Sequence, residues 1–196
     1  NAERNVQADL RVIACQGWTR DQFWDQTGLV WVNPSPNMRS LTEALLYPGI
    51  GLLEATNLAT GRGTDTPFER LGAPWIDPAG FASALNQKSL PGLRFVPVRF
   101  TPKERQYAGK ECGGVLLIID DWSRFEPIET GLSIAVALRS LYPREWQSDK
   151  LLTLLANTTV FDGFQAGRSV SELHALWRTE LETFLKVREK YLLYRR

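Results

Sequence analysis

Apolar and polar residues follow two periods along this chain, and strand-like patterns dominate its first part. Residues 93–100 alternate apolar with polar side chains, which is the period of a half-buried strand. Residues 113–120 are apolar and β-branched, as in a central strand. The apolar runs at 10–14 and 50–55 are two further strand candidates. We therefore predict a mixed sheet of about four to five strands, packed by helices.

Capping residues mark where helices begin in the first half of the chain. Ser40 and Glu43 form a capping box, and the helix that they open is expected to end at Pro48. Asp77 precedes Pro78, which combines an N-cap with proline at the first helical position. Both signals predict short helices between the strands.

The second half of the chain has the helical period. Helices are expected at 129–141 and 149–156, and Ser169 with Glu172 is a second capping box. It opens a long amphipathic C-terminal helix. The apolar face of this helix consists of Leu173, Leu176, Trp177, Leu181, Phe184, Leu185 and Val187. The apolar residues 191–194 are expected to dock onto the body of the protein. With early strands and late helices, the fold class is α+β.

Composition limits the classes of function. The 196 residues suit one domain, and 43% hydrophobic residues with seven tryptophans can supply a core. The formal net charge of +1 gives no argument for binding nucleic acid or an anionic membrane. No apolar run reaches the roughly 20 residues that a membrane-spanning helix needs. We predict a globular domain with neither a nucleic-acid partner nor a membrane span.

Few residues suited to metal or nucleophilic chemistry are present. His174 is the only histidine and lies within the long C-terminal helix, so a histidine-based metal cluster or catalytic triad is not expected. Cys15 and Cys112 lie in apolar, strand-like segments and are expected to be buried free thiols. The chain has no CxxC, HExxH or GxxxxGK[ST] motif. We therefore predict no metal site and no cofactor.

The stretch 52–77 differs from an ordinary connecting loop. It is long, and it carries Arg62 between two glycines, which permit close approach of the backbone to a ligand. The loop therefore suits the binding of a polar ligand. The same residues also fit a structural loop in which Arg62 pairs with Glu54 or Glu69.

Carboxylates and aromatic rings are the remaining chemical groups of interest. The candidate carboxylates are Glu54, Asp65, Glu69, Asp77, Asp120 and Asp121. Glycosidases use two carboxyl groups about 5–5.5 Å or about 6.5–9.5 Å apart, and no spacing in this sequence predicts such a pair. Glu54 stands out because it directly follows an apolar segment. Candidates for stacking on a sugar, or for packing in the core, are Trp18, Trp24, Trp31 and Trp75.

Short motifs occur in a fixed order along nearly the whole chain. The first are at 17–20 (Gly-Trp-Thr-Arg), 34–38 (Pro-Ser-Pro-Asn-Met), 45–49 (Leu-Leu-Tyr-Pro-Gly) and 54–57 (Glu-Ala-Thr-Asn). The later ones are at 61–64 (Gly-Arg-Gly-Thr), 67–69, 72–77, 100–102, 107–109, 112–115 and 191–194. Taken together, they resemble the C-terminal domain of the NamZ-type peptidoglycan exo-β-N-acetylmuramidases, long known only as a domain of unknown function.

The resemblance implies a glycoside hydrolase that removes terminal N-acetylmuramic acid from peptidoglycan fragments. Such enzymes have a Rossmann-like N-terminal domain with the catalytic acid, and the active cleft lies between it and a smaller C-terminal domain. On this basis residues 1–196 are expected to be the single C-terminal domain of a two-domain glycosidase, inactive without the missing N-terminal domain. The expected partners are muramic acid glycans and that domain, and the substrate implies a periplasmic or extracellular location.

The resemblance also implies a set of binding residues. Glu54, Thr56, Asn57, Arg62 and Thr64 are expected to line the cleft. Arg62 would pair with the lactyl carboxylate of muramic acid, because a guanidinium group matches a carboxylate bidentately. Thr56 and Asn57 would bind sugar hydroxyls or the acetamido group. The catalytic groups are expected in the N-terminal domain, with Glu54 as the candidate within this chain.

The chain departs from the family pattern at two places. Ala55 stands where the family has glycine, and Leu117 and Ile118 occupy a neighbourhood in which relatives often carry a histidine. A contact made by that histidine would be missing here. The alternative function is a non-catalytic carbohydrate or cell-wall binding module, or a structural interaction domain.

Overall fold

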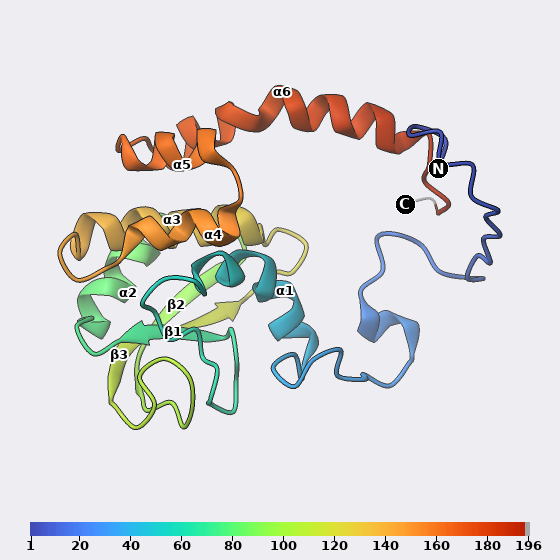
Figure 1. The fold of residues 1–196 in the computed structure, drawn as a ribbon. Coiled ribbons are helices and arrows are strands. Elements are labelled where there is room, and N and C mark those ends of the chain that lie inside the picture. Colours follow the sequence, from blue (N-terminus) through green and yellow to red (C-terminus); the bar gives the residue numbers. More distant parts are fainter. Residues whose placement is uncertain (195–196) are drawn as a thin grey trace.

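The computed structural model describes residues 1–194, and its centre is a small antiparallel sheet (Figure 1). The described residues form three strands in the order β1-β3-β2, with β1 at Arg70–Ala73, β2 at Leu93–Phe100 and β3 at Cys112–Ile119. β2 pairs with β3 along its whole length. The α+β class is confirmed. The predicted mixed sheet of four to five strands is wrong, because these three strands are all antiparallel.

Helices lie before, between and after the strands, and they dominate the chain from Pro127 onwards. They are α1 (Leu41–Ile50), α2 (Pro78–Asn86), α3 (Pro127–Leu141), α4 (Leu152–Leu155), α5 (Thr158–Gln165) and α6 (Val170–Glu189). The short 3-10 helices are η1 (Trp24–Thr27), η2 (Gly51–Leu53) and η3 (Ser148–Leu151). The predicted helix at 149–156 therefore consists of η3 followed by α4.

The capping signals are confirmed. The backbone N–H of Glu43 donates to the Ser40 hydroxyl at 3.1 Å, and the Glu43 carboxylate accepts from the N–H of Ser40 in return. The N–H of Gly80 donates to the Asp77 carboxylate at 2.9 Å. Ser169 caps α6 in a second capping box. Caps are local interactions, so the sequence is enough to predict them.

Two predicted strands are wrong. Residues 50–55 contain the last residue of α1 and all of η2, and α1 continues past Pro48. This apolar run buries Ile50 and Leu53 as part of a helical segment, and periodicity alone cannot distinguish that from a buried strand. Residues 10–14 form no strand and are exposed, with Ile13 at 86%.

Helices α1 and α3 cross at unusually close range because glycines meet there. A Cβ atom on Gly49 would lie 2.0 Å from the carbonyl oxygen of Pro127. One on Gly131 would lie 2.4 Å from the carbonyl oxygen of Gly49. Only residues without a side chain permit this approach. The crossing fixes the position of η2 and of the loop that follows it.

The core lies between the sheet and the helices. Its largest fully buried side chains include Phe68, Phe81, Phe164, Leu46, Leu53, Leu71, Leu117, Leu132 and Leu138. Cys112 is buried and is a free thiol, as predicted. Cys15 is also free, but it is exposed, so its predicted burial is wrong.

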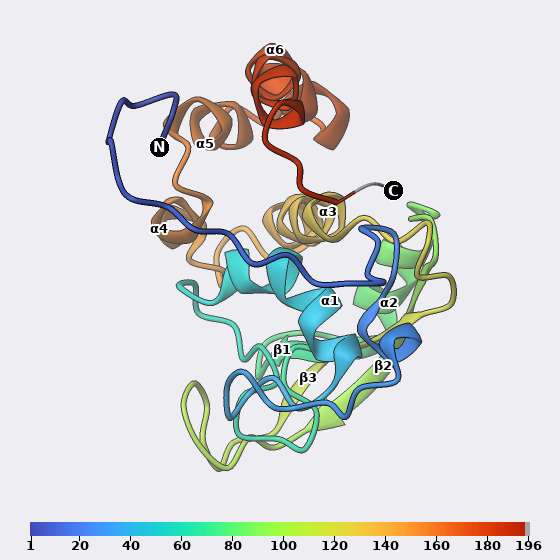
Figure 2. The same cartoon turned by 90° about the vertical axis from the view of Figure 1, so that its right-hand side faces the viewer.

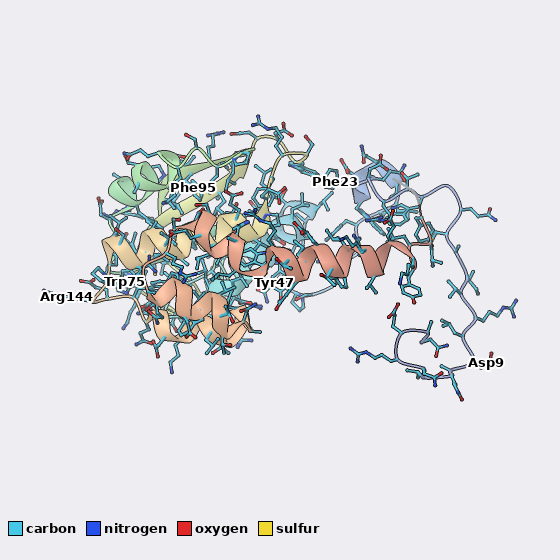
Figure 3. All side chains as sticks on the ribbon, turned by 90° about the horizontal axis from the view of Figure 1, so that it is seen from above. Asp9, Phe23, Tyr47, Trp75, Phe95 and Arg144 are labelled. Atoms are coloured by element: carbon cyan, nitrogen blue, oxygen red, sulfur yellow. The ribbon has the colours of Figure 1, made fainter. Side chains whose placement is uncertain are left out.

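Residues 1–39, called the arm below, lie at the periphery of the body and curve back to α1 (Figures 1 and 2), and Phe23 of the arm meets Trp122 edge-on at 5.6 Å. Figure 3 shows Asp9 far from the packed side chains around Trp75 and Phe95. The expectation that residues 191–194 dock onto the body is wrong. Leu193 is 61% exposed, and Tyr194 packs edge-on against Trp18 of the arm at 4.8 Å. Among residues 1–194, no helix is long and apolar enough to cross a membrane.

Candidate functional site

A cavity of about 570 Å³ with a mixed polar and apolar lining opens where the loop after η2 meets the loop before β3. Its lining consists of Glu54, Ala55, Leu58, Ala59, Thr60, Arg62, Arg105, Gln106, Thr153 and Leu154. Helix α4 supplies the last two, so three separate parts of the chain build the walls. Two guanidinium groups, one carboxylate and one amide give the cavity its polar character.

Arg62 is paired with Glu54 on one wall of this cavity. Its Nε donates to Glu54 Oε1, and its Nη2 donates to Glu54 Oε2 at 3.2 Å. The guanidinium carbon also lies 5.2 Å from the centre of the Phe68 ring, which is a cation–π distance. The hydrogen bond with Glu54 raises the pKa of Arg62 above its ordinary value. Of the two structural partners that the sequence left open, Glu54 is the one observed.

The glycines around Arg62 allow a tight turn under a neighbouring loop. Gly61 and Gly63 both have φ of +78°, a conformation that side chains disfavour. A Cβ atom on Gly63 would lie 2.7 Å from the backbone nitrogen of Glu104. The N–H of Lys103 donates to the carbonyl of Gly63 at 2.8 Å. The turn therefore seats the loop at residues 101–110 beside Arg62.

The side chains of three predicted binding residues form hydrogen bonds with other parts of the same chain. The buried Thr56 hydroxyl donates to the carbonyl of Leu53, and the Thr64 hydroxyl donates to that of Gly61. Asn57 donates to the carbonyl of Glu145 and accepts from the N–H of Gln147, both at 2.8 Å. Glu54 and Arg62 line the cavity, whereas these three residues brace the loop that carries them.

The sequence interpretation missed the loop at 101–110. Arg105 is exposed, lines the cavity and makes no ion pair with any residue in 1–194. Its φ of +64° is unusual for a residue with a side chain. The Tyr107 hydroxyl donates to the carbonyl of Asn57 at 3.0 Å and ties this loop to the other wall. The polarity of the loop was visible in the sequence, but its position beside Arg62 depends on contacts distant in the chain.

One pair of carboxylates comes together near the start of α1. Glu43 is only 2% exposed, and its carboxylate accepts from the backbone N–H groups of Arg39 and Ser40. Burial raises the pKa of Glu69, and the charge of Glu43 raises it further. Neither residue lines the cavity. This pair is therefore separate from the site around Arg62.

The other candidate carboxylates have structural partners or lie at the surface. Asp77 caps α2, and Asp120 forms an ion pair with Arg94 at 3.0 Å. Hydrogen bonds from Ser123 lower the pKa of Asp121. Within residues 1–194, no group of three or more histidine, cysteine or acidic side chains could hold a metal ion.

The four candidate tryptophans do not share one surface. Trp75 packs against Tyr142, with ring centres 5.3 Å apart. Trp18, Trp24 and Trp31 belong to the arm, and the rings of Trp24 and Trp31 meet edge-on at 6.1 Å. His174 lies on α6 against Trp177. None of these aromatic rings lines the cavity beside Arg62.

Two family models match the chain. The model described as exo-β-N-acetylmuramidase NamZ, C-terminal, matches residues 45–194, and its N-terminal counterpart matches residues 1–42. The peptidoglycan β-N-acetylmuramidase NamZ of Bacillus subtilis (strain 168) is 36% identical over 197 residues, which cover 99% of this chain and 48% of that protein.

Two solved structures from Bacteroides fragilis NCTC 9343 also match, and both are described as DUF1343 family proteins. The first has a TM-score of 0.83 at 24% identity and covers 91% of this chain and 49% of the other. The second has a TM-score of 0.62 at 26% identity and covers 83% and 44%. At this identity the first match shows the fold alone. The chain spans about half the length of each relative that it matches.

Proposed function

Because this chain belongs to the NamZ family of exo-β-N-acetylmuramidases, we propose that it forms the substrate-cleft half of a peptidoglycan-degrading enzyme. That enzyme hydrolyses the glycosidic bond of a terminal N-acetylmuramic acid. The match of residues 45–194 to the C-terminal family model supports this assignment. The catalytic acid then belongs to an N-terminal domain of the same protein. We propose a periplasmic or extracellular location, because peptidoglycan lies there, and fractionation of cells would test it.

The observation that carries the proposal is the cavity with Arg62 and Arg105 on its walls. N-acetylmuramic acid differs from N-acetylglucosamine by a lactyl ether that ends in a carboxylate. A guanidinium group binds a carboxylate by charge and by paired hydrogen bonds. A cavity with two such groups therefore suits an anionic sugar better than a neutral one.

The two arginines have different roles in this proposal. Glu54 takes hydrogen bonds from Nε and Nη2 of Arg62, which leaves the Nη1 group to contact substrate. Arg105 has no ion pair within residues 1–194, so its charge is available to the lactyl carboxylate. Glu54 positions Arg62, and the Gln106 amide is placed to bind a hydroxyl or the acetamido group.

The requirement of the N-terminal domain for hydrolysis is tested with a chromogenic muramic acid glycoside. We expect no turnover by residues 1–196 alone and turnover by the full-length protein. Adding the N-terminal domain to the chain should restore hydrolysis. Turnover by the chain alone would overturn the proposal. Glycan binding without any restored hydrolysis would instead support a non-catalytic binding module.

The role of Arg105 is tested in the full-length protein with paired substrates. Loss of a charge-assisted hydrogen bond costs about 1.5–3 kcal/mol, which corresponds to about a 10–100-fold loss of kcat/KM. We expect Arg105→Ala to cause this loss on a muramic acid glycoside and far less on the matching glucosamine glycoside. Lys103→Ala is the control, because Lys103 is on the same loop but does not line the cavity. An equal loss on both substrates would argue against carboxylate recognition.

A further inference from the structure

Helix α6 has two halves with different surroundings. In the first half, Leu173 is fully buried and Trp177 packs partly against the core. In the second half, Leu181, Phe184 and Leu185 are 44%, 58% and 43% exposed. Figure 1 shows this half extending beyond the body towards the arm.

The exposed residues continue the buried face of the same helix. The spacing from Leu173 through Trp177 to Leu181 is four residues at each step, and Phe184 and Leu185 follow three and four residues later. Residues at these spacings share one side of a helix. The apolar stripe therefore begins in the core and runs out into solvent. Monomeric proteins rarely leave such an apolar patch exposed to solvent. Larger exposed apolar patches mark interaction sites.

The arm carries apolar residues that also lack a partner. Residues 10–14 and 29–32 have the composition of strands, yet neither forms a strand within residues 1–194. Ile13 and Val30 are among the most exposed large apolar side chains. Strand-like backbone with unpaired N–H and C=O groups is a template for joining a sheet.

Hydrogen bonds and a ring contact hold the residues that follow α6 against the arm. The N–H of Cys15 donates to the Tyr194 hydroxyl at 2.8 Å, and Trp18 packs on the same ring. The Tyr191 hydroxyl donates to the carboxylate of Glu3 at 2.8 Å. Figure 2 shows the arm and the chain end after α6 on the same side of the molecule.

We propose that this α6–arm surface is the docking site for a NamZ-type N-terminal domain, whose sheet takes up residues 10–14 and 29–32. Residues 1–42 match the N-terminal family model, and the matched relatives are about twice as long as this chain. Helix α6 then spans both domains, with Leu173 anchored in one core and Phe184 in the other.

The proposal rests on the two-domain architecture in the proposed function, but its test does not use hydrolysis. Phe184→Lys is compared with Glu182→Lys, which places the same side chain on the opposite, polar side of α6. Both variants are made in the 196-residue chain and in the full-length protein. The measurements are the thermal midpoint and the rate of trypsin cleavage within the arm.

In the 196-residue chain, we expect both variants to shift the midpoint by less than about 2 °C, because both positions are exposed. In the full-length protein, Phe184→Lys should lower the midpoint by more than about 5 °C and speed arm cleavage at least about tenfold. Glu182→Lys should change neither. If the full-length protein shows this pattern but has no muramidase activity, the docking proposal would be supported and only the proposed function would be overturned.

Two results would overturn docking. One is equal behaviour of the two variants in the full-length protein. The other is a dimer of the 196-residue chain, measured by light scattering, that Phe184→Lys makes monomeric while the full-length protein is insensitive. That result would assign the surface to a second copy of the chain. Leu181→Lys repeats the comparison at an independent position if Phe184→Lys fails to fold in the full-length protein.

Discussion

Arg62 makes two contacts and shares a pocket with Arg105, a combination that no single-residue pattern reveals. The sequence showed an arginine between glycines, and both a ligand role and a structural role fitted it. The structure adds the Glu54 carboxylate, the ring of Phe68 and the neighbouring Arg105. The ion pair with Glu54 links positions eight residues apart, so it was within reach of local reasoning. The presence of Arg105 in the same pocket was not, because it depends on how a distant loop folds over Gly63.

We expect Arg62→Ala to lower the free energy of unfolding by about 1.5–3 kcal/mol, the usual value for hydrogen bonds to charged groups. Its partner Glu54 has a side chain only 18% exposed, so the carboxylate would be left without a cation and poorly hydrated. Urea unfolding measures the loss. Glu54→Ala and the double variant complete a thermodynamic cycle. Strictly additive losses would show that the two side chains do not stabilise each other.

The two cysteines should differ in reactivity although both are free. Burial raises the pKa of Cys112 to about 11, so its thiolate does not form near neutral pH. Cys15 is exposed. We expect a thiol reagent to label Cys15 alone at pH 8 and both cysteines after denaturation. Cys15→Ser should abolish labelling of the native protein, and any labelling that survives would contradict burial of Cys112.

The raised pKa of Cys112 also makes the free energy of unfolding depend on pH, and the number of protons bound by each state gives the direction. The unfolded thiol ionises near pH 9.0, whereas the folded one holds its proton until about pH 11. The unfolded state therefore binds fewer protons in this window, and stability falls as pH rises from about 9 to 11. Cys112→Ala should weaken this fall, which urea unfolding at pH 8 and pH 10.5 would measure.

At the scale of elements, local sequence signals predicted helix starts and the bounds of β2 correctly. Strands that are defined by pairing with a distant part of the chain were not predicted. The alternation at 93–100 gave the bounds of β2, and three N-caps appeared where the sequence placed them. β1 has only four residues and includes Gly72, so it is defined by its pairing with β3 and not by its own pattern. Residues 50–55 have the composition of a strand because an apolar run carries no period, yet Ile50 ends α1 and residues 51–53 form η2.

The α1–α3 crossing should be the element contact most sensitive to side-chain volume. A methyl group on Gly49 would overlap the backbone of Pro127, which cannot move without separating the helices. We expect Gly49→Ala to cost about 3 kcal/mol, the upper part of the usual range for overpacking. The corresponding fall in melting temperature is roughly 6–12 °C for a chain of this size.

The control for this crossing is Ser140→Ala, which adds no volume at an exposed position of α3. Its midpoint should stay within about 2 °C of the parent protein. A Gly49→Ala variant with the same small shift would mean that the helices separate easily. The position of η2, and with it Glu54, would then depend on other contacts.

At the scale of the whole molecule, the chain divides into a packed body and an arm that adds little to it. None of residues 1–40 is buried, and the first fully enclosed side chains are Glu43 and Leu46 of α1. The sequence interpretation treated residues 1–196 as one domain, because nothing in the composition marks a boundary. The strand-like pattern at 10–14 was real, but a strand needs a neighbour, and the described residues provide none.

Trypsin should therefore remove the arm before the body unfolds. Arg4, Arg11 and Arg20 lie outside the helices and strands, in a segment with no buried residue, so cleavage there needs no global opening. Cleavage after Arg39 should be slower, because its N–H donates to the buried Glu43 carboxylate, so residues 21–39 should be lost after residues 1–20. Mass spectrometry over time should show early loss of the arm and a persistent fragment that retains the body. Its thermal midpoint should lie within about 2 °C of the intact chain, because surface contacts of this kind contribute little. Loss of the arm and the body at one common rate would mean that the arm stabilises the body, and the boundary near residue 40 would then be wrong.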